Sequence, residues 1–515
     1  MGLGRALAVA LVGLEGHVVE VQADVAPGLP AFTLVGLPDT SLAESRERVR
    51  SALGNAGQAL PSRRITINLA PAALPKSGTG FDLAVAAALL AATRAVDDRL
   101  VAGVVHLGEL ALDGRVHPVR GVLPAVRAAV AAGHGKVVVA EQNAAEARLV
   151  PAADVIPVRW LSDVVALHRG VDPSEWPGPW EIPAHPDPQV PRLRAVPDLA
   201  DVVGQTAARR ALEVAAAGGH HLLLLGPPGA GKTMLAARLP GLLPDLDEEQ
   251  ALEVTAVHSV AGTLDASAGL VRRPPFQDPH HTATVTALVG GGNGMPRPGA
   301  ASRAHRGVLF LDEAPEFTSA ALDALRQPLE HGELVIHRAL GAARFPARFQ
   351  LVLAANPCPC GRATGTGEDC SCTPMARRRY LHRLSGPLLD RVDLQVEVPA
   401  VTRADLALDL PRESTALVAA RVAAARDVAR ERLRPLGLSC NADLSGRVLR
   451  GELALPRPVV ADIDRALERG RLTVRGYDRV LRISWTEADL DGATAPGRDH
   501  VARALLLRQL ARVAA

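Results

Sequence analysis

Residues 226–233 read Gly226-Pro227-Pro228-Gly229-Ala230-Gly231-Lys232-Thr233. They match the pattern G-x-x-x-x-G-K-[ST] in full, after a leucine-rich run at 221–225 and before a helix-forming run at 234–239. A glycine loop between a strand and a helix binds phosphate, because its curled backbone turns N–H groups toward phosphate oxygens. We therefore expect all eight residues to bind ATP, with Lys232 at the β- and γ-phosphates and Thr233 on Mg²⁺.

Polar side chains end two further apolar strands. Val308 to Leu311 runs into Asp312 and Glu313, and the strand at 351–355 runs into Asn356. Asp312 would hold Mg²⁺, directly or through water, and Glu313 would polarise the attacking water. Asn356 could fix that water without adding charge, although an Asn after a strand can also be a simple turn residue.

Two arginines are candidates for stabilising charge in the transition state. Arg391 could complete the ATP site of a neighbouring subunit as an arginine finger. The alternative is a surface salt bridge to Asp390 or Asp393. Arg475 follows Leu472-Thr-Val in the helical C-terminal part, and it could reach the γ-phosphate within its own subunit or be one of many helix-surface arginines.

The composition indicates a globular protein of two or three domains, with 515 residues, 48% hydrophobic and 22% charged. A formal charge of +2 argues neither for nor against nucleic acid, and 3% aromatic residues make base stacking a poor primary binding mode. No apolar run approaches the roughly 20 residues of a membrane span. Neither a signal-peptide pattern nor a secreted disulfide framework is evident, so we expect a cytoplasmic protein without membrane contact.

The chain divides at a proline-rich connector. Eight of the 28 residues at 170–197 are proline, which favours an extended segment. Before it, 1–169 mixes period-two runs with Ala-rich helical stretches and predicts an α+β domain. After it, 198–402 alternates strands and helices as an α/β nucleotide-binding core, and 403–515 is mostly helical.

Several motifs together resemble the ComM/YifB family of magnesium-chelatase-like AAA+ ATPases. They are Pro279-His-His, Gly290-Gly-Gly, Ala304-His-Arg-Gly-Val-Leu-Phe-Leu-Asp-Glu, Leu325-Arg-Gln-Pro-Leu-Glu, Asn356-Pro-Cys-Pro-Cys-Gly and Leu384-Ser-Gly-Pro-Leu-Leu-Asp-Arg. The resemblance implies a homo-hexameric ring with an ATPase core, a helical lid and a DNA helicase activity. For the ComM branch it implies branch migration during natural transformation. By motif position it assigns catalytic roles to Lys232, Thr233, Asp312, Glu313, Asn356, Arg391 and Arg475.

The N-terminal part resembles the Lon protease domain in residues 75–81 and 107–119. The position of the Lon serine is Gly80 and that of its lysine is Leu123, so the resemblance implies an inactive protease. Ser77 with the adjacent Lys76 is a residual possibility, although adjacent residues rarely share a productive geometry.

Four cysteines form two C-x-C pairs, Cys358 with Cys360 and Cys370 with Cys372. Four thiols around a Gly/Thr-rich loop suit tetrahedral Zn²⁺, although structural zinc sites usually have the spacing C-x₂-C. Bound Zn²⁺, free thiols and a redox-sensitive disulfide all remain open. Cys440 has no nearby partner in the sequence and is expected to be a buried apolar residue.

Residues 333–345 read as a hairpin between two core strands, and the family analogy points its tip into the ring pore. Arg338 and Arg344 could there follow DNA phosphates irrespective of base sequence, or they could simply decorate a solvated hairpin. The inserted stretch 262–299 is interpreted as a second pore element.

Three functions compete. The first is an ATP-driven DNA translocase, the second is a protein-remodelling motor like the ATPase of a metal chelatase, and the third is a Lon-like protease. Gly80 and Leu123 disfavour the third. Stimulation of ATP hydrolysis by DNA would separate the first from the second.

Overall fold

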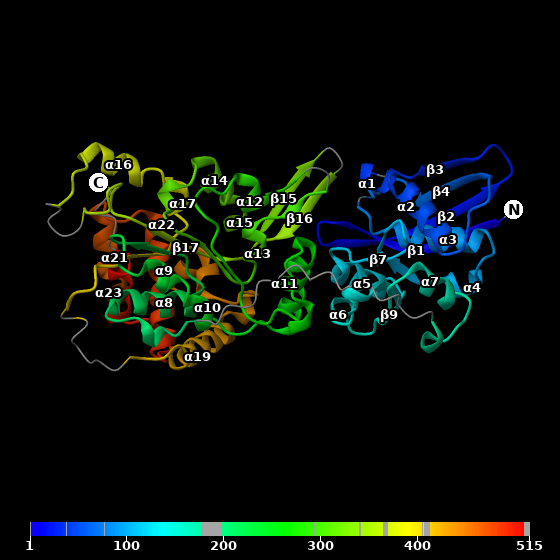
Figure 1. Cartoon of the computed structure of the whole chain (residues 1–515). Helices are drawn as coiled ribbons and strands as arrows, with labels where there is room; N and C mark the ends of the chain where they lie inside the picture. The colour runs from blue at the N-terminus through cyan, green and yellow to red at the C-terminus, as the bar shows by residue number, and fades with distance from the viewer. Residues whose placement is uncertain are drawn as a thin grey trace.

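The computed structural model describes residues 2–37, 39–76, 78–176, 197–292, 295–338, 341–363, 369–403, 405 and 412–508. Most of the expected proline-rich connector, 177–196, lies outside the described residues. Two bodies are visible, an N-terminal one in blue to teal and a larger one in green to red (Figure 1).

The N-terminal body is built on a seven-stranded sheet. Its strands, in spatial order, are β3 (Ala31–Val35), β4 (Arg64–Ala70), β2 (Glu15–Ala26), β1 (Gly2–Val12), β5 (Val105–Leu107), β8 (Lys136–Ala140) and β9 (Asp154–Val158). A separate small hairpin pairs β6 (Glu109–Leu110) with β7 (Val116–His117). The helices are α1 (Thr40–Ala43), α2 (Ser45–Asn55), α3 (Asp82–Ala92), α4 (Asp98–Val101), α5 (Val122–Ala131), α6 (Ala144–Ala147) and α7 (Leu161–Leu167).

This sheet is mixed. β1, β2 and β4 pair antiparallel, whereas β3 is parallel to β4, β1 is parallel to β5, and β5, β8 and β9 are parallel and joined through α5 and α6. The part with β5, β8 and β9 follows a local α/β pattern, because parallel neighbours need a crossover connection. The apolar helix α3 is buried along its whole length and lies close to β1. A Cβ at Gly4 would lie 2.0 Å from the carbonyl oxygen of Ala88, so this approach requires glycine.

The larger body contains a five-stranded sheet whose neighbouring strands all run parallel. The order is β11 (Phe276–Gln277), β14 (Val308–Leu311), β17 (Gln350–Ala355), β10 (Leu222–Leu225) and β18 (Leu394–Glu397). Two small antiparallel pairs accompany it, β12 (Gly290–Gly291) with β13 (Arg297–Pro298) and β15 (Glu333–Arg338) with β16 (Gly341–Pro346). Its helices are α8 (Thr206–Gly218), α9 (Lys232–Ala236), α10 (Leu239–Leu242), α11 (Glu248–Ala261), α12 (Val285–Val289), α13 (Ala300–Arg303), α14 (Ser319–Ala324), α15 (Arg326–His331), α16 (Pro374–Leu381) and α17 (Gly386–Leu389).

The C-terminal part is helical, as the sequence predicts. It comprises α19 (Thr415–Leu433), α20 (Gly446–Arg450), α21 (Arg457–Glu468), α22 (Val474–Leu490) and α23 (Arg498–Leu506). The helix expected over 498–514 is described only up to residue 508. These helices share one hydrophobic core with α8 and with the Leu222 and Leu224 face of β10, while Leu223 and Leu225 face the core on the other side. Strand β10 thus has two covered faces, as a parallel strand requires.

The two bodies touch through α11, which packs against α5. The Ser259 hydroxyl donates to Glu146 Oε1 at 2.5 Å, and the Gly121 N–H donates to the Ser259 carbonyl at 3.3 Å. Burial raises the pKa of Glu146. No helix among the described residues is long and apolar enough to cross a membrane.

Candidate ATP site and its surroundings

The glycine loop lies between β10 and α9, at the carboxyl edge of the parallel sheet. Gly229 and Gly231 have φ values of +76° and +90°, which side-chain-bearing residues rarely adopt. Gly226 must also be glycine, because a Cβ there would lie 2.1 Å from the Val398 carbonyl oxygen. The motif requires glycine at positions 226 and 231, and the backbone conformation and close contacts explain why glycine stands at all three positions.

Lys232 is nearly buried and points back into this loop. Its Nζ donates to the carbonyl oxygens of Gly226 and Pro227 at 2.7 and 2.9 Å, and to Asn356 Oδ1 at 3.0 Å. Burial lowers the pKa of Lys232, and the nearby Asp312 and Glu313 oppose that shift. The asparagine after β17 therefore lies beside the lysine that the motif assigns to the phosphates.

Thr233 and Asp312 are also in contact. The Thr233 hydroxyl donates to Asp312 Oδ2 at 2.6 Å, and Asp312 Oδ1 accepts the Glu313 N–H at 2.9 Å. A hydroxyl and a carboxylate at this separation form an oxygen donor set of the kind that Mg²⁺ prefers, usually alongside water and substrate phosphates. These two side chains fit a magnesium ion that would neutralise phosphate charge.

Glu313 has a contact that sequence reasoning missed. His281 Nδ1 lies 3.1 Å from Glu313 Oε2, and Glu313 has a positive φ of 49°, which is unusual for a residue with a side chain. His281 reaches this place because β11 joins the sheet beside β14, so residues after both strands meet at the same edge. In the sequence, only the Pro279-His-His motif pointed to this residue. The motif contributed to the family resemblance, but the resemblance assigned no role to either histidine.

Arg391 and Arg475 lie close to each other, and neither contacts Lys232 or the residues that Lys232 bonds to. Arg391 forms an ion pair with Glu330 and donates to the Pro387 carbonyl at 2.6 Å, rather than pairing with Asp390 or Asp393. Arg475 is exposed and pairs with Asp390 at 2.8 Å. Burial lowers the pKa of Arg391, and the positive charge of Arg475 contributes to that shift. The two arginines therefore belong to one cationic cluster.

The four paired cysteines converge after β17. Their sulfur atoms all lie within 4.8 Å of one another, and all four are free thiols. A hydrogen bond from the Arg362 backbone N–H lowers the pKa of Cys360 to about 6, while burial raises the pKa of Cys358 to about 11. Cys440 is half-buried rather than fully buried as expected, and its thiol donates to Asp443 Oδ2 at 3.0 Å.

The β15–β16 hairpin has the bounds expected from the sequence, and its tip, 339–340, lies outside the described residues. Arg338 is exposed, and Arg344 Nη1 lies 3.5 Å from Glu333 Oε1 with a side chain 65% exposed. The hairpin runs toward the N-terminal body (Figure 1). Its base meets the β1–β2 turn, because a Cβ at Gly13 would lie 2.5 Å from the Arg344 carbonyl oxygen.

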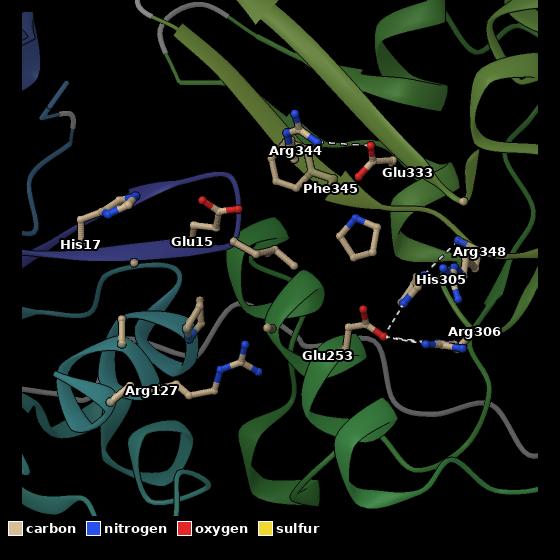
Figure 2. Close-up of a pocket in the computed structure, with 18 of the residues that line it drawn as sticks. Glu15, His17, Arg127, Glu253, His305, Arg306, Glu333, Arg344, Phe345 and Arg348 are labelled. Carbon is tan, nitrogen blue, oxygen red and sulfur yellow. Dashed lines mark hydrogen bonds and ion pairs between the residues drawn. The ribbon is translucent and has the colours of Figure 1, made fainter. Parts of the chain in front are cut away.

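Beside this contact, a cavity of about 830 Å³ is lined by residues of the hairpin base, of the N-terminal body and of the ATPase core (Figure 2). Its charged and titratable lining consists of Arg127, Arg306, Arg344, Arg348, His17, His305, His331, Glu15, Glu253 and Glu333. Glu253 is paired with Arg306 at 3.2 Å and lies 2.9 Å from His305 Nε2. Among the described residues, Arg127 and Arg348 form no ion pair, so each body contributes one unpaired guanidinium group to the cavity.

Neither Gly80 nor Leu123, the positions that the sequence resemblance assigns to a Lon serine and lysine, offers a nucleophile or a base. Gly80 has no side chain, and Leu123 is fully buried. Lys76 is buried and its Nζ donates to the Pro71 carbonyl, while Ser77 lies outside the described residues.

A parallel sheet in this order, with a glycine loop after β10, two acids after β14, an asparagine after the intervening strand β17 and a helical C-terminal part, is typical of an AAA+-type ATPase. Family models agree: magnesium chelatase subunit ChlI matches residues 198–406, its C-terminal part matches 412–508, and a further ChlI-subunit model matches 21–143. The chain belongs to the ComM/YifB family of magnesium-chelatase-like proteins.

Relatives match along nearly the whole chain. Competence protein ComM of Haemophilus influenzae is 42% identical over 514 residues, covering 100% of this chain and 99% of its own. YifB of Escherichia coli is 41% identical over 506 residues, covering 98% and 96%. The magnesium-chelatase 38 kDa subunit of Rhodobacter capsulatus is 28% identical over 335 residues, covering 61% and 86%.

Proposed function

We propose that this chain is an ATP-driven DNA translocase that works as a ring of identical subunits and moves branched recombination intermediates. The observation that carries the proposal is the arginine-bearing hairpin, which opens onto a cavity with the free guanidinium groups of Arg127 and Arg348. Guanidinium groups bind phosphate in bidentate fashion without reading bases, as a translocase requires. The similarity to a competence protein over the full chain supports the same class of substrate.

ATP hydrolysis supplies the motion in this proposal. Lys232 and the eight-residue loop hold the phosphates, Thr233 and Asp312 hold Mg²⁺, Glu313 polarises the attacking water and Asn356 orients it. The 2.6 Å contact between Thr233 and Asp312 and the 3.0 Å contact between Lys232 and Asn356 support these assignments.

The position of the two remaining arginines supports the proposed ring. Arg391 and Arg475 lie in one cluster around Asp390 and Glu330, and neither contacts the glycine loop of its own chain. We therefore assign both to the ATP site of the adjacent subunit, where their charge would stabilise the transition state. The earlier expectation that Arg475 acts within its own subunit is replaced by this proposal.

The N-terminal body is proposed to be a Lon-like domain without protease activity that contributes to DNA binding. Gly80 and the buried Leu123 support the loss of proteolysis. Arg127 on α5 supports the DNA role, because it faces the same cavity as the hairpin base (Figure 2).

The test is binding of a fluorescent four-way DNA junction, followed by anisotropy over a range of salt concentrations. Replacing Arg338 and Arg344 by Ala should weaken binding and reduce the slope of log K against log salt by about 2, at about 0.9 per lost phosphate contact. Arg99→Ala, an exposed residue on the short helix α4, is the matched control and should leave the slope unchanged.

Two different outcomes would contradict different parts of the proposal. If the wild-type chain does not bind DNA, the translocase function is wrong and a chelatase-like action on a protein partner becomes the better explanation. If the wild-type chain binds DNA but the hairpin variant has the same slope, the DNA-binding surface lies elsewhere on the chain.

A further inference from the structure

The cysteine cluster has the dimensions of a single-metal site. Cys358 Sγ lies 3.3 Å from Cys360 Sγ and 3.5 Å from Cys370 Sγ, and Cys360 Sγ lies 3.6 Å from Cys370 Sγ. A tetrahedral Zn²⁺ with Zn–S bonds of about 2.3 Å holds its sulfurs about 3.8 Å apart. A disulfide would need about 2.05 Å between two sulfurs. The four thiols are therefore spaced for an ion at their centre, and none of them is joined in a disulfide.

Nearby backbone amides favour the thiolate form of these cysteines. Those of Arg362 and Ala363 act to lower the pKa of Cys358, that of Arg362 the pKa of Cys360, and that of Cys360 the pKa of Cys372. Such outer contacts orient ligands and stabilise thiolate charge in metal sites. Four sulfur ligands leave no open position, so an ion here would be structural.

The cluster is attached to the ATP site at two points. Cys358 lies two residues after Asn356, whose Oδ1 accepts from Lys232 at 3.0 Å. Gly361, within the same loop, packs on the glycine loop so closely that a Cβ would lie 2.5 Å from Pro228 Cδ. A change in the shape of the cysteine loop would therefore move both Asn356 and Pro228.

We propose that Cys358, Cys360, Cys370 and Cys372 bind one Zn²⁺ and that this ion fixes Asn356 and the phosphate loop in their working positions. Binding releases the thiol protons to solvent and forms four Zn–S bonds, without a change in oxidation state. This inference goes beyond DNA translocation and does not depend on it, because it concerns the ATP site of the chain alone.

The first measurement is the metal content of the purified full-length chain by inductively coupled plasma mass spectrometry. One Zn²⁺ per chain is expected, with loss of that ion in a variant carrying both Cys360→Ser and Cys372→Ser. Cys440→Ser is the matched control and should retain one Zn²⁺, because this half-buried thiol lies outside the cluster. Absence of stoichiometric metal, even after Zn²⁺ is added to the reduced chain, overturns the site, and iron in its place overturns the assignment to zinc.

The second measurement tests the link to the ATP site without relying on the variants folding. The wild-type chain is stripped with a chelator, and binding of a fluorescent ATP analogue is compared before and after Zn²⁺ alone is returned. Affinity should fall roughly tenfold on stripping and recover with Zn²⁺, since small misplacements in such sites cost 10- to 100-fold. A stripped chain that keeps its circular dichroism spectrum and its full affinity would show that the ion does not position the loop.

Discussion

His281 and Glu313 illustrate what a pattern of residues can and cannot predict. The motif places Lys232, Thr233 and Asp312 at one site, and the structure brings their side chains into contact with one another or with Asn356. His281 could not be placed, because the strand that brings it there, β11, is only two residues long and has no recognisable periodicity. Side chains that follow apolar strands of four to six residues could be predicted, and a side chain that follows a two-residue strand in an insert could not.

His281→Ala should lower kcat for ATP hydrolysis about tenfold and leave the KM for ATP nearly unchanged. The imidazole lies 3.1 Å from the Glu313 carboxylate and orients it, so its loss misplaces a group that acts only during the reaction. His281→Gln keeps a polar atom near Glu313 and should recover part of the rate.

His280→Ala is the control, because His280 bonds to Thr282 at 2.9 Å and not to Glu313. Equal effects of the two alanine variants on kcat would mean that the loop as a whole matters, and not the contact to Glu313.

At the scale of elements, the strands and helices around the ATP site are predictable and the N-terminal sheet is only partly so. Runs such as Val308–Leu311 are apolar throughout, which marks a strand buried on both faces. In the N-terminal body, β5, β8 and β9 are also short, and such runs do not encode the direction of pairing. The sequence therefore predicts an α+β domain without revealing that four of the six neighbouring strand pairs in its sheet are parallel.

Two buried histidines make the stability of the N-terminal body depend on pH. His106 Nε2 on β5 lies 2.8 Å from His168 Nε2 just after α7, and burial lowers the pKa values of the two rings to about 3 and about 4. The unfolded chain takes up protons as the pH falls through about 6.5, whereas the folded chain does not. The contribution of these histidines to the free energy of unfolding should thus be fully present above pH 6.5. It should decrease between pH 6.5 and 4, by about 1.4 kcal/mol per pH unit for each histidine.

Urea unfolding followed by tryptophan fluorescence at pH 7.5 and pH 5 measures this loss. A variant with His106→Leu and His168→Leu has no ring to protonate and should lose markedly less stability on acidification. The same pH dependence in both chains would assign the effect to other groups.

At the scale of the whole molecule, the arrangement of the arginines predicts active sites shared between subunits. Arg391 lies with Arg475 in a cluster separate from the glycine loop, so one subunit would supply Lys232 and its neighbour Arg391. The chain sequence alone could suggest this from a motif, but could not show that the two arginines lie together. The hydrogen bond from Arg475 to Asp390, which brings the two arginines together, connects residues 85 positions apart in the sequence.

Mixing two inactive variants tests the shared site. Lys232→Ala and Arg391→Ala should each abolish hydrolysis, whereas an equimolar mixture should recover up to about a quarter of wild-type activity. In a randomly mixed ring, roughly one interface in four pairs an intact Lys232 with an intact Arg391. A mixture no more active than its components would place Arg391 outside the neighbour's site.

The most direct test of the central claim is steady-state ATP hydrolysis with no DNA, with linear duplex and with a synthetic four-way junction, using Lys232→Ala as the blank. We expect hydrolysis to rise strongly with the junction and less with the duplex, because a motor that moves branches should couple its ATP site to branched DNA. An active enzyme whose rate is the same under all three conditions would contradict the account.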